Sequence, residues 1–167
     1  MSDRTSDPRP SDPLPKAARR ALFWINLWPP YLGAGIRVRR VPGEAAVEVT
    51  MKNRWWNGNY YGTHFGGSLY SMCDPFFTLL LFWQLGRGYN VLDQAATIEF
   101  LRPGKGTVRA RFEVPPETVQ EIRAQAASGE KLLPEFEARV LGPDGEVVAK
   151  VGKVVYVRKK RRVQSGE

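Results

Sequence analysis

The sequence predicts a single α+β domain in which an antiparallel β-sheet packs against one long, buried helix. Residues 68–85 form an apolar run whose only charge is Asp74, and Gly86 and Gly88 follow it. Shorter segments before and after this run alternate apolar and polar residues, which is typical of half-buried strands. Several hairpin-like connections join these segments consecutively, which favours antiparallel pairing over a doubly wound parallel sheet.

The composition is that of an ordinary globular protein, with 167 residues of which 43% are hydrophobic and 25% charged. The single cysteine, Cys73, excludes an internal disulfide and is consistent with a reducing, cytoplasmic location. One cysteine and one histidine are too few for a structural zinc site.

The formal net charge of +8 is concentrated near the two ends of the chain. Residues 1–20 hold five basic and three acidic side chains, and residues 157–167 hold five basic side chains and one acidic one. Because charge runs in terminal segments are usually solvated, the domain itself is not unusually basic. The charge distribution therefore argues against nucleic-acid binding.

The N-terminal part of the chain divides into an arm and a helix. Residues 1–15 are polar and rich in proline without an apolar signal-peptide segment, so we expect a disordered arm. Residues 16–28 have the pattern of an amphipathic helix that ends at Pro29-Pro30. With Arg19, Arg20 and its aromatic residues, this helix could lie on a membrane surface. We favour packing over an exposed edge of its own domain.

The remaining elements follow from alternation and turn residues. Residues 36–41 and 45–52 form a predicted hairpin around Pro42-Gly43, in which Val47, Val49 and Met51 share the inward face. After the apolar run, the sequence predicts strands and one short surface helix within residues 91–102, 107–114, 117–127 (helix), 135–141 and 147–158. The predicted domain therefore covers residues 16–158, and residues 159–167 form a basic tail.

The apolar run is long enough to raise the question of a membrane span. It approaches the roughly 20 residues that a transmembrane helix needs. However, Asp74-Pro75 lies near its middle, where a carboxylate costs about 2.5–3.5 kcal/mol on insertion scales. We therefore predict no transmembrane span and a helix buried against the sheet. Its remaining apolar surface would be covered by a second copy of the chain, in a homodimer or a homotetramer.

A glycine-rich loop, residues 58–67, precedes the apolar run and forms the candidate site with it. A helix that begins in such a loop presents unpaired backbone N–H groups, which suit an anion or a developing oxyanion. Asp74 follows one to two turns later, either as a catalytic carboxylate or as a buried group that stabilises a kink at Pro75. His64 is either a site residue or a group that fixes the loop, and Asn59 is more typical of a turn than of a ligand contact.

Two motifs resemble the hotdog-fold acyl-CoA thioesterases. The segment from His64 to Asp74 resembles the His-Gly-Gly segment and helix aspartate of the phenylacetate-degradation type, with the aspartate seven positions after Gly67. Residues 98–106 resemble the strand-end FLRP-x-x-G turn of the superfamily. Residues 30–36 and the loop up to Gly67 resemble an uncharacterised bacterial branch with a domain of unknown function. The resemblance covers about residues 16–158.

The resemblance implies an antiparallel sheet wrapped around a central helix and hydrolysis of an acyl thioester. Backbone N–H groups of Gly67 and Gly66 would polarise the thioester carbonyl, and Asp74 from the partner subunit would activate water or attack directly. No metal or separate cofactor is implied, because coenzyme A is part of the substrate. Arg102 and Lys105 are candidates for attracting its phosphates.

This sequence also departs from the family motif, because Phe65 separates His64 from the glycine pair. For that reason we expect His64 to orient substrate or close the loop instead of meeting the carbonyl. The main alternative is a non-catalytic module that binds acyl thioesters or lipids, with a structural Asp74. A third reading uses the basic termini to bind nucleic acid or anionic lipid.

Overall fold

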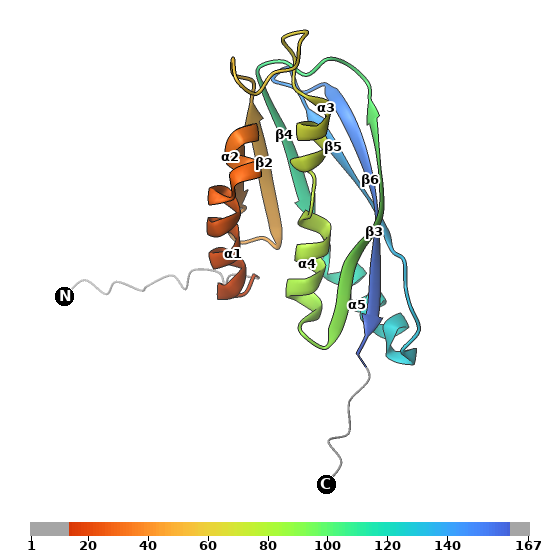
Figure 1. Cartoon of the computed structure of the whole chain (residues 1–167). Coiled ribbons are helices and arrows are strands. Elements are labelled where there is room, and N and C mark those ends of the chain that lie inside the picture. The colour runs from red at the N-terminus through yellow and green to blue at the C-terminus, as the bar shows by residue number, and fades with distance from the viewer. Residues whose placement is uncertain (1–13, 161–167) are drawn as a thin grey trace, which may run out of the picture.

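A computed structural model describes residues 14–160 as a curled antiparallel sheet around a helical segment (Figure 1). The six strands lie in the order β1-β2-β4-β5-β6-β3. Their bounds are β1 (Ile36–Arg40), β2 (Ala46–Lys52), β3 (Tyr89–Phe100), β4 (Thr107–Glu113), β5 (Glu135–Leu141) and β6 (Val147–Lys159). The helices are α1 (Lys16–Leu27), α2 (Pro29–Ala34), α3 (Gly66–Ser71), α4 (Phe76–Leu85) and α5 (Pro116–Gln125), followed by a 3₁₀ turn, η1 (Ala126–Ser128).

The core lies between the concave face of the sheet and α4. The predicted inward positions of β2 and β4 are buried, and the two strands pair along their full length from Ala46–Glu113 to Lys52–Thr107. Phe112 of β4 contacts two rings of α4, with ring centroids 5.1 Å from Phe76 and 5.2 Å from Phe77. The alternating pattern therefore predicted the buried face, whereas the pairing of β2 with β4 was not predicted.

The central helical segment is in two pieces, which corrects the expectation of one helix over residues 68–85. Helix α3 ends at Ser71, α4 begins at Phe76, and Pro75 lies between them. Proline has no N–H to donate and its ring disfavours helical backbone in the residue before it. The break places Asp74 in a turn between two helices instead of along a helix face.

Helix α1 packs over β1, as the favoured interpretation of this segment predicts. Strand β1 is an edge of the sheet, so one side of its backbone lacks a strand partner. The Asn26 side chain takes that place: its Nδ2 donates to the Val38 carbonyl at 2.9 Å, and its Oδ1 accepts from the Val38 N–H at 2.8 Å. A single side-chain amide thus satisfies both exposed backbone groups of one edge residue.

Helix α2 was not predicted, and the packed chain extends slightly beyond both of its predicted ends. Pro29 and Pro30 end α1 but also begin α2, because proline fits the first turn of a helix. Leu14, assigned to the disordered arm, is 2% exposed and joins the core. Strand β6 continues to Lys159. The rest of the predicted arm and tail, residues 1–13 and 161–167, lies outside the described residues.

The opposite edge of the sheet, β3, has no covering element among residues 14–160. It pairs with β6 on one side, and most of its residues are exposed, including Leu92 at 61% and Phe100 at 54%. None of the helices in the described part of the chain is long and apolar enough to cross a membrane.

We expect Asn26→Ala to lower the free energy of unfolding by about 1–2 kcal/mol, because it leaves the Val38 N–H and C=O without their partner. Urea denaturation followed by circular dichroism measures the change. The control is Asn90→Ala, which removes an exposed amide from the other edge strand and should alter stability by less than about 0.5 kcal/mol. Equal stability of the Asn26 variant and the wild type would contradict the edge-covering role.

Candidate functional site

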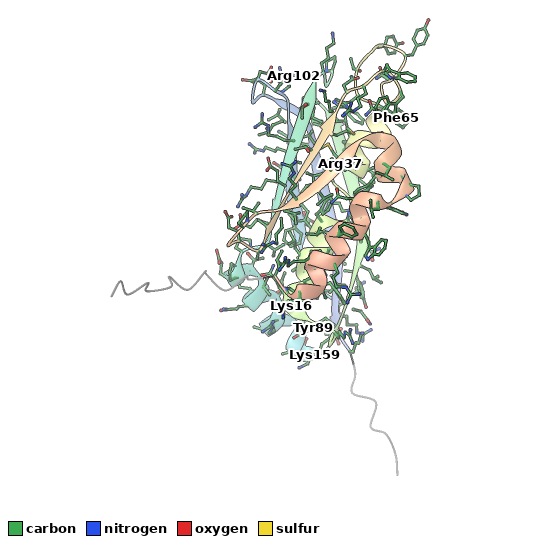
Figure 2. All side chains as sticks on the ribbon, turned by 90° about the vertical axis from the view of Figure 1, so that its left-hand side faces the viewer. Lys16, Arg37, Phe65, Tyr89, Arg102 and Lys159 are labelled. Carbon is green, nitrogen blue, oxygen red and sulfur yellow. The ribbon has the colours of Figure 1, made fainter. Side chains whose placement is uncertain are left out.

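A hollow of about 470 Å³ lies between the glycine-rich loop, the start of α3 and the end of β3. Its polar and glycine residues come from the glycine-rich loop and from the turn after β3. Leu69, Phe100 and Leu101 add apolar surface. Figure 2 shows Phe65 and Arg102 at this end of the molecule. The lining residues are Asn59, Tyr61, Thr63, His64, Gly66, Leu69, Phe100, Leu101, Arg102, Pro103 and Gly104.

Asn59 shapes the loop that forms one wall of the hollow. Its Oδ1 accepts from the N–H groups of Tyr61 (2.9 Å) and Thr63 (3.1 Å). Its Nδ2 donates to the Thr63 hydroxyl at 2.8 Å and to the His64 carbonyl at 3.2 Å. Asn59 thus has the contacts of a turn-forming residue. It also lines the hollow, and its contact with substrate stays a prediction.

Gly66 and Gly67 begin α3 where an added side chain would meet an aromatic ring. A Cβ at Gly66 would lie 3.0 Å from the Phe100 ring, and one at Gly67 would lie 2.5 Å from the Phe65 ring. Among the described residues, neither glycine N–H has a hydrogen-bond partner, whereas Ser68 N–H already donates to the Phe65 carbonyl. Both glycine donors are therefore available to a ligand oxygen.

His64 fixes the loop to the turn that follows β3. Its backbone N–H donates to the Gly104 carbonyl at 2.9 Å, and its Nε2 lies 3.1 Å from the Gly106 carbonyl oxygen. A carbonyl only accepts, so Nε2 carries the proton and Nδ1 is the unprotonated nitrogen. Burial lowers the pKa of His64, while the Gly106 contact opposes the shift. The ring is therefore neutral at pH 7, and these contacts match the loop-fixing role.

Asp74 belongs to a buried ion-pair cluster centred on Lys153. The Lys153 side chain is fully buried, and its Nζ lies 2.6 Å from Asp74 Oδ1 and 3.1 Å from Asp93 Oδ1. It also donates to the Tyr70 hydroxyl at 3.3 Å. Both carboxylates keep contact with solvent, since 40% of the Asp74 side chain and 30% of the Asp93 side chain are exposed. The lysine thus pairs from the interior of the domain with carboxylates that remain accessible to solvent.

The cluster keeps Lys153 charged in spite of its burial. Burial lowers the pKa of Lys153, but the carboxylates of Asp74 and Asp93 and the Tyr70 hydroxyl together raise it above its ordinary value. The Asp74 backbone is held as well, because the Tyr31 hydroxyl donates to the Asp74 carbonyl and, at 3.0 Å, to the Ser71 carbonyl. Burial, followed by the nearby Asp74 charge, raises the pKa of Tyr31, which stays protonated as a donor.

Arg102, one of the two predicted phosphate contacts, lines the hollow, and the other, Lys105, follows the lining residue Gly104 in the sequence. Arg102 Nη2 donates to Asp144 Oδ1 at 2.5 Å, which raises the pKa of the guanidinium and lowers that of the Asp144 carboxyl. Lys105 is exposed. Within one chain, the hollow brings together His64, Asn59, Gly66 and Arg102, but Asp74, Gly67 and Lys105 are not among its lining residues.

Lys153 and Asp93 were missed by the sequence analysis. Lys153 occupies an inward position of β6, two residues from Val151 and two from Val155, which are both buried. A lone lysine at an inward position of an otherwise apolar strand is the signal that could have identified it, because an unpaired buried ammonium is costly. Within residues 14–160, no group of three or more His, Cys, Asp or Glu side chains could hold a metal ion.

The family model described as Domain of unknown function (DUF4442) matches residues 18–157, and the chain belongs to this family. No curated protein matches the sequence significantly. The solved structures similar to this chain include a Pseudomonas aeruginosa protein of unknown function called a probable thioesterase. It is 22% identical, with a TM-score of 0.74 over 89% of this chain and 99% of that one.

Two further solved structures are similar to this chain. A thioesterase from Haemophilus influenzae is 14% identical, with a TM-score of 0.62 over 87% of this chain and 93% of that one. The Escherichia coli PaaI protein from the phenylacetic acid degradation operon is 19% identical, with a TM-score of 0.57 over 87% and 94% of the two chains. The chain therefore has the hotdog fold of thioesterase-like proteins, which confirms the predicted fold class and resemblance.

We expect the stability of the protein to fall as the pH is lowered from 7.5 towards 5, with His64 as a contributor. The folded-state pKa of His64 is below its unfolded value of about 6.5, so the unfolded chain binds a proton first and gains stability. In urea denaturation across this range, the free energy of unfolding of His64→Gln should depend less on pH, because the glutamine side chain does not titrate. Parallel pH profiles for the two proteins would contradict a neutral, buried His64.

We expect Asp74→Asn and Asp93→Asn to be strongly non-additive in stability. Each single change leaves Lys153 one carboxylate and should cost about 1 kcal/mol, because both carboxylates are partly solvated. The double change leaves a buried ammonium unpaired and should exceed the sum by about 1–3 kcal/mol. Adding Lys153→Met to the double variant should recover much of the loss. Additive changes in a denaturation cycle would contradict the shared role of Lys153.

Proposed function

We propose that the protein hydrolyses an acyl thioester, with Asp74 as the group that activates water or attacks the carbonyl carbon. The observation that carries this proposal is the state of the Asp74 side chain. It is paired with a buried lysine at 2.6 Å, its backbone carbonyl is held by Tyr31, and yet 40% of it faces solvent. A carboxylate that is fixed from inside and accessible from outside is suited to general base or nucleophilic catalysis.

The proposed active site is shared by two copies of the chain. Asp74 is not part of the hollow of its own chain, whereas Phe100, at the end of the uncovered edge strand β3, is. Pairing of β3 with the β3 strand of a second copy would cover this edge and bring the α3–α4 turn of one copy towards the hollow of the other. This supports a homodimer, and a dimer of dimers extends the same arrangement.

In the proposed reaction, the thioester carbonyl oxygen accepts hydrogen bonds from the free N–H groups of Gly66 and Gly67. Asp74 removes a proton from water as the water oxygen bonds to the carbonyl carbon. The tetrahedral intermediate then collapses, the carbon–sulfur bond breaks, and the leaving thiolate takes up a proton, which leaves a carboxylic acid and a free thiol. Arg102 in the lining of the hollow and the exposed Lys105 suit the phosphates of coenzyme A.

A second candidate is a non-catalytic module that binds acyl thioesters or lipids. The observation that favours it is the short contact between Lys153 Nζ and Asp74 Oδ1, because this carboxylate oxygen already serves to neutralise a buried ammonium. In this case the cluster has a structural role, and the hollow with its apolar residues Leu69, Phe100 and Leu101 holds the ligand.

We expect Asp74→Asn to reduce kcat for hydrolysis of acyl-CoA substrates by at least about 100-fold, because the amide cannot accept the proton from water. A thiol-release assay with short, medium and aromatic acyl-CoAs measures the rate. Asp93→Asn is the matched control, since it alters the same lysine contact from the neighbouring carboxylate and should retain activity within about threefold.

Two results would contradict this mechanism. Unchanged turnover by Asp74→Asn would exclude the carboxylate from the reaction. Binding of acyl-CoA by the folded wild type without turnover of any substrate would instead establish the binding module.

A further inference from the structure

We propose that the outer face of α1 is a docking surface for an anionic lipid bilayer. Helix α1 uses one face, with Ala18 and Leu22, to pack against the domain. Its opposite face carries Phe23, Trp24 and Leu27, which are 60%, 64% and 47% exposed. Packing over β1 therefore accounts for the buried apolar residues of this helix but not for the exposed ones.

The exposed apolar residues form a continuous surface and are not scattered. Phe23 and Leu27 are four residues apart and lie on one face of the helix, with Trp24 beside them. The surface continues through Trp28 and Leu32, which are 54% and 43% exposed. Figure 2 views this side of the molecule, with α1 in front of the sheet and its side chains directed outward. Large exposed apolar surfaces of this kind mark interaction sites.

Basic residues accompany this surface without any acidic neighbour in the sequence. Lys16, Arg19 and Arg20 are exposed and line a groove of about 640 Å³ together with Phe23 and Trp24. Residues 14–43 contain six basic residues and no acidic one. The combination of Phe, Trp and Leu with Lys and Arg on one helix face is typical of helices that lie in the membrane interface.

The position of these cations argues for an anionic partner. They occupy the first turns of α1, where the positive end of the helix dipole disfavours them, and α1 has neither an acidic residue in its first turn nor a side-chain cap. An anionic surface removes this repulsion. A second copy docked by two-fold symmetry would instead place the same cations of both chains near one another. The charge distribution therefore favours an acidic lipid surface over self-association through this face.

Sedimentation with large unilamellar vesicles tests the proposal on the full-length protein. We expect binding to vesicles of phosphatidylcholine with about 30% phosphatidylserine, little binding to phosphatidylcholine alone, and weaker binding as salt increases. The double variants Phe23→Ser/Trp24→Ser and Arg19→Glu/Arg20→Glu should each reduce the partition coefficient by at least about tenfold. All four side chains are exposed, so both variants should fold, which circular dichroism confirms.

Matched controls place the same changes elsewhere on the surface. Trp55→Ser/Tyr60→Ser removes two rings that are 92% and 98% exposed and lie outside the lining of the hollow, and Arg87→Glu/Arg109→Glu makes the same change in charge at exposed positions. Both controls should bind as the wild type does. Failure of the wild type to bind acidic vesicles at low salt, or equal loss in variants and controls, would overturn the proposal. Self-association that Phe23→Ser/Trp24→Ser abolishes, without vesicle binding, would overturn it in favour of a second copy.

Discussion

The buried ammonium of Lys153 is the interaction on which the arrangement of helices against the sheet depends. It lies on the inward face of β6 and pairs with Asp93 of β3 and with Asp74 of the turn between α3 and α4. Thr78 of α4 donates to Asp93, so the second helix joins the same cluster. A buried charge is tolerated only with its partners in place, so this cluster ties the turn beside Pro75 to β3 and β6.

The hollow beside the glycine-rich loop depends on a different set of contacts. Asn59 and His64 hold the loop through hydrogen bonds to its own backbone and to the turn after β3. Gly66 allows the Phe100 ring to pack against the start of α3, which closes the wall between loop and strand. The two halves of the candidate site are thus fixed independently, one by a loop network and one by a buried ion pair. Only the assembly of two chains would join them.

The sequence predicted most strands and the hairpin because alternation reports burial directly, as the inward residues Val108, Ala110 and Phe112 of β4 illustrate. It could not locate the cluster, since the partners of Lys153 come from segments 60 to 79 residues away and pairing across that distance leaves no local pattern. At Pro75 the sequence predicted at most a kink in one helix, because the apolar residues continue on both sides of it. The loop-fixing contacts of His64 likewise depend on the turn after β3.

The two edges of the sheet are treated differently, and this asymmetry separates the two proposed surfaces. At β1, the Asn26 amide takes both backbone groups of Val38 and α1 packs over the strand, so another strand could pair here only by displacing them. At β3, the backbone and the side chains of Leu92 and Phe100 stay uncovered within residues 14–160. The proposed self-association therefore uses β3, where it would complete the proposed site. The outer face of α1 points away from that edge and stays accessible to a partner of another kind. Its aromatic and basic residues are therefore better matched to a lipid surface than to a second copy of the chain.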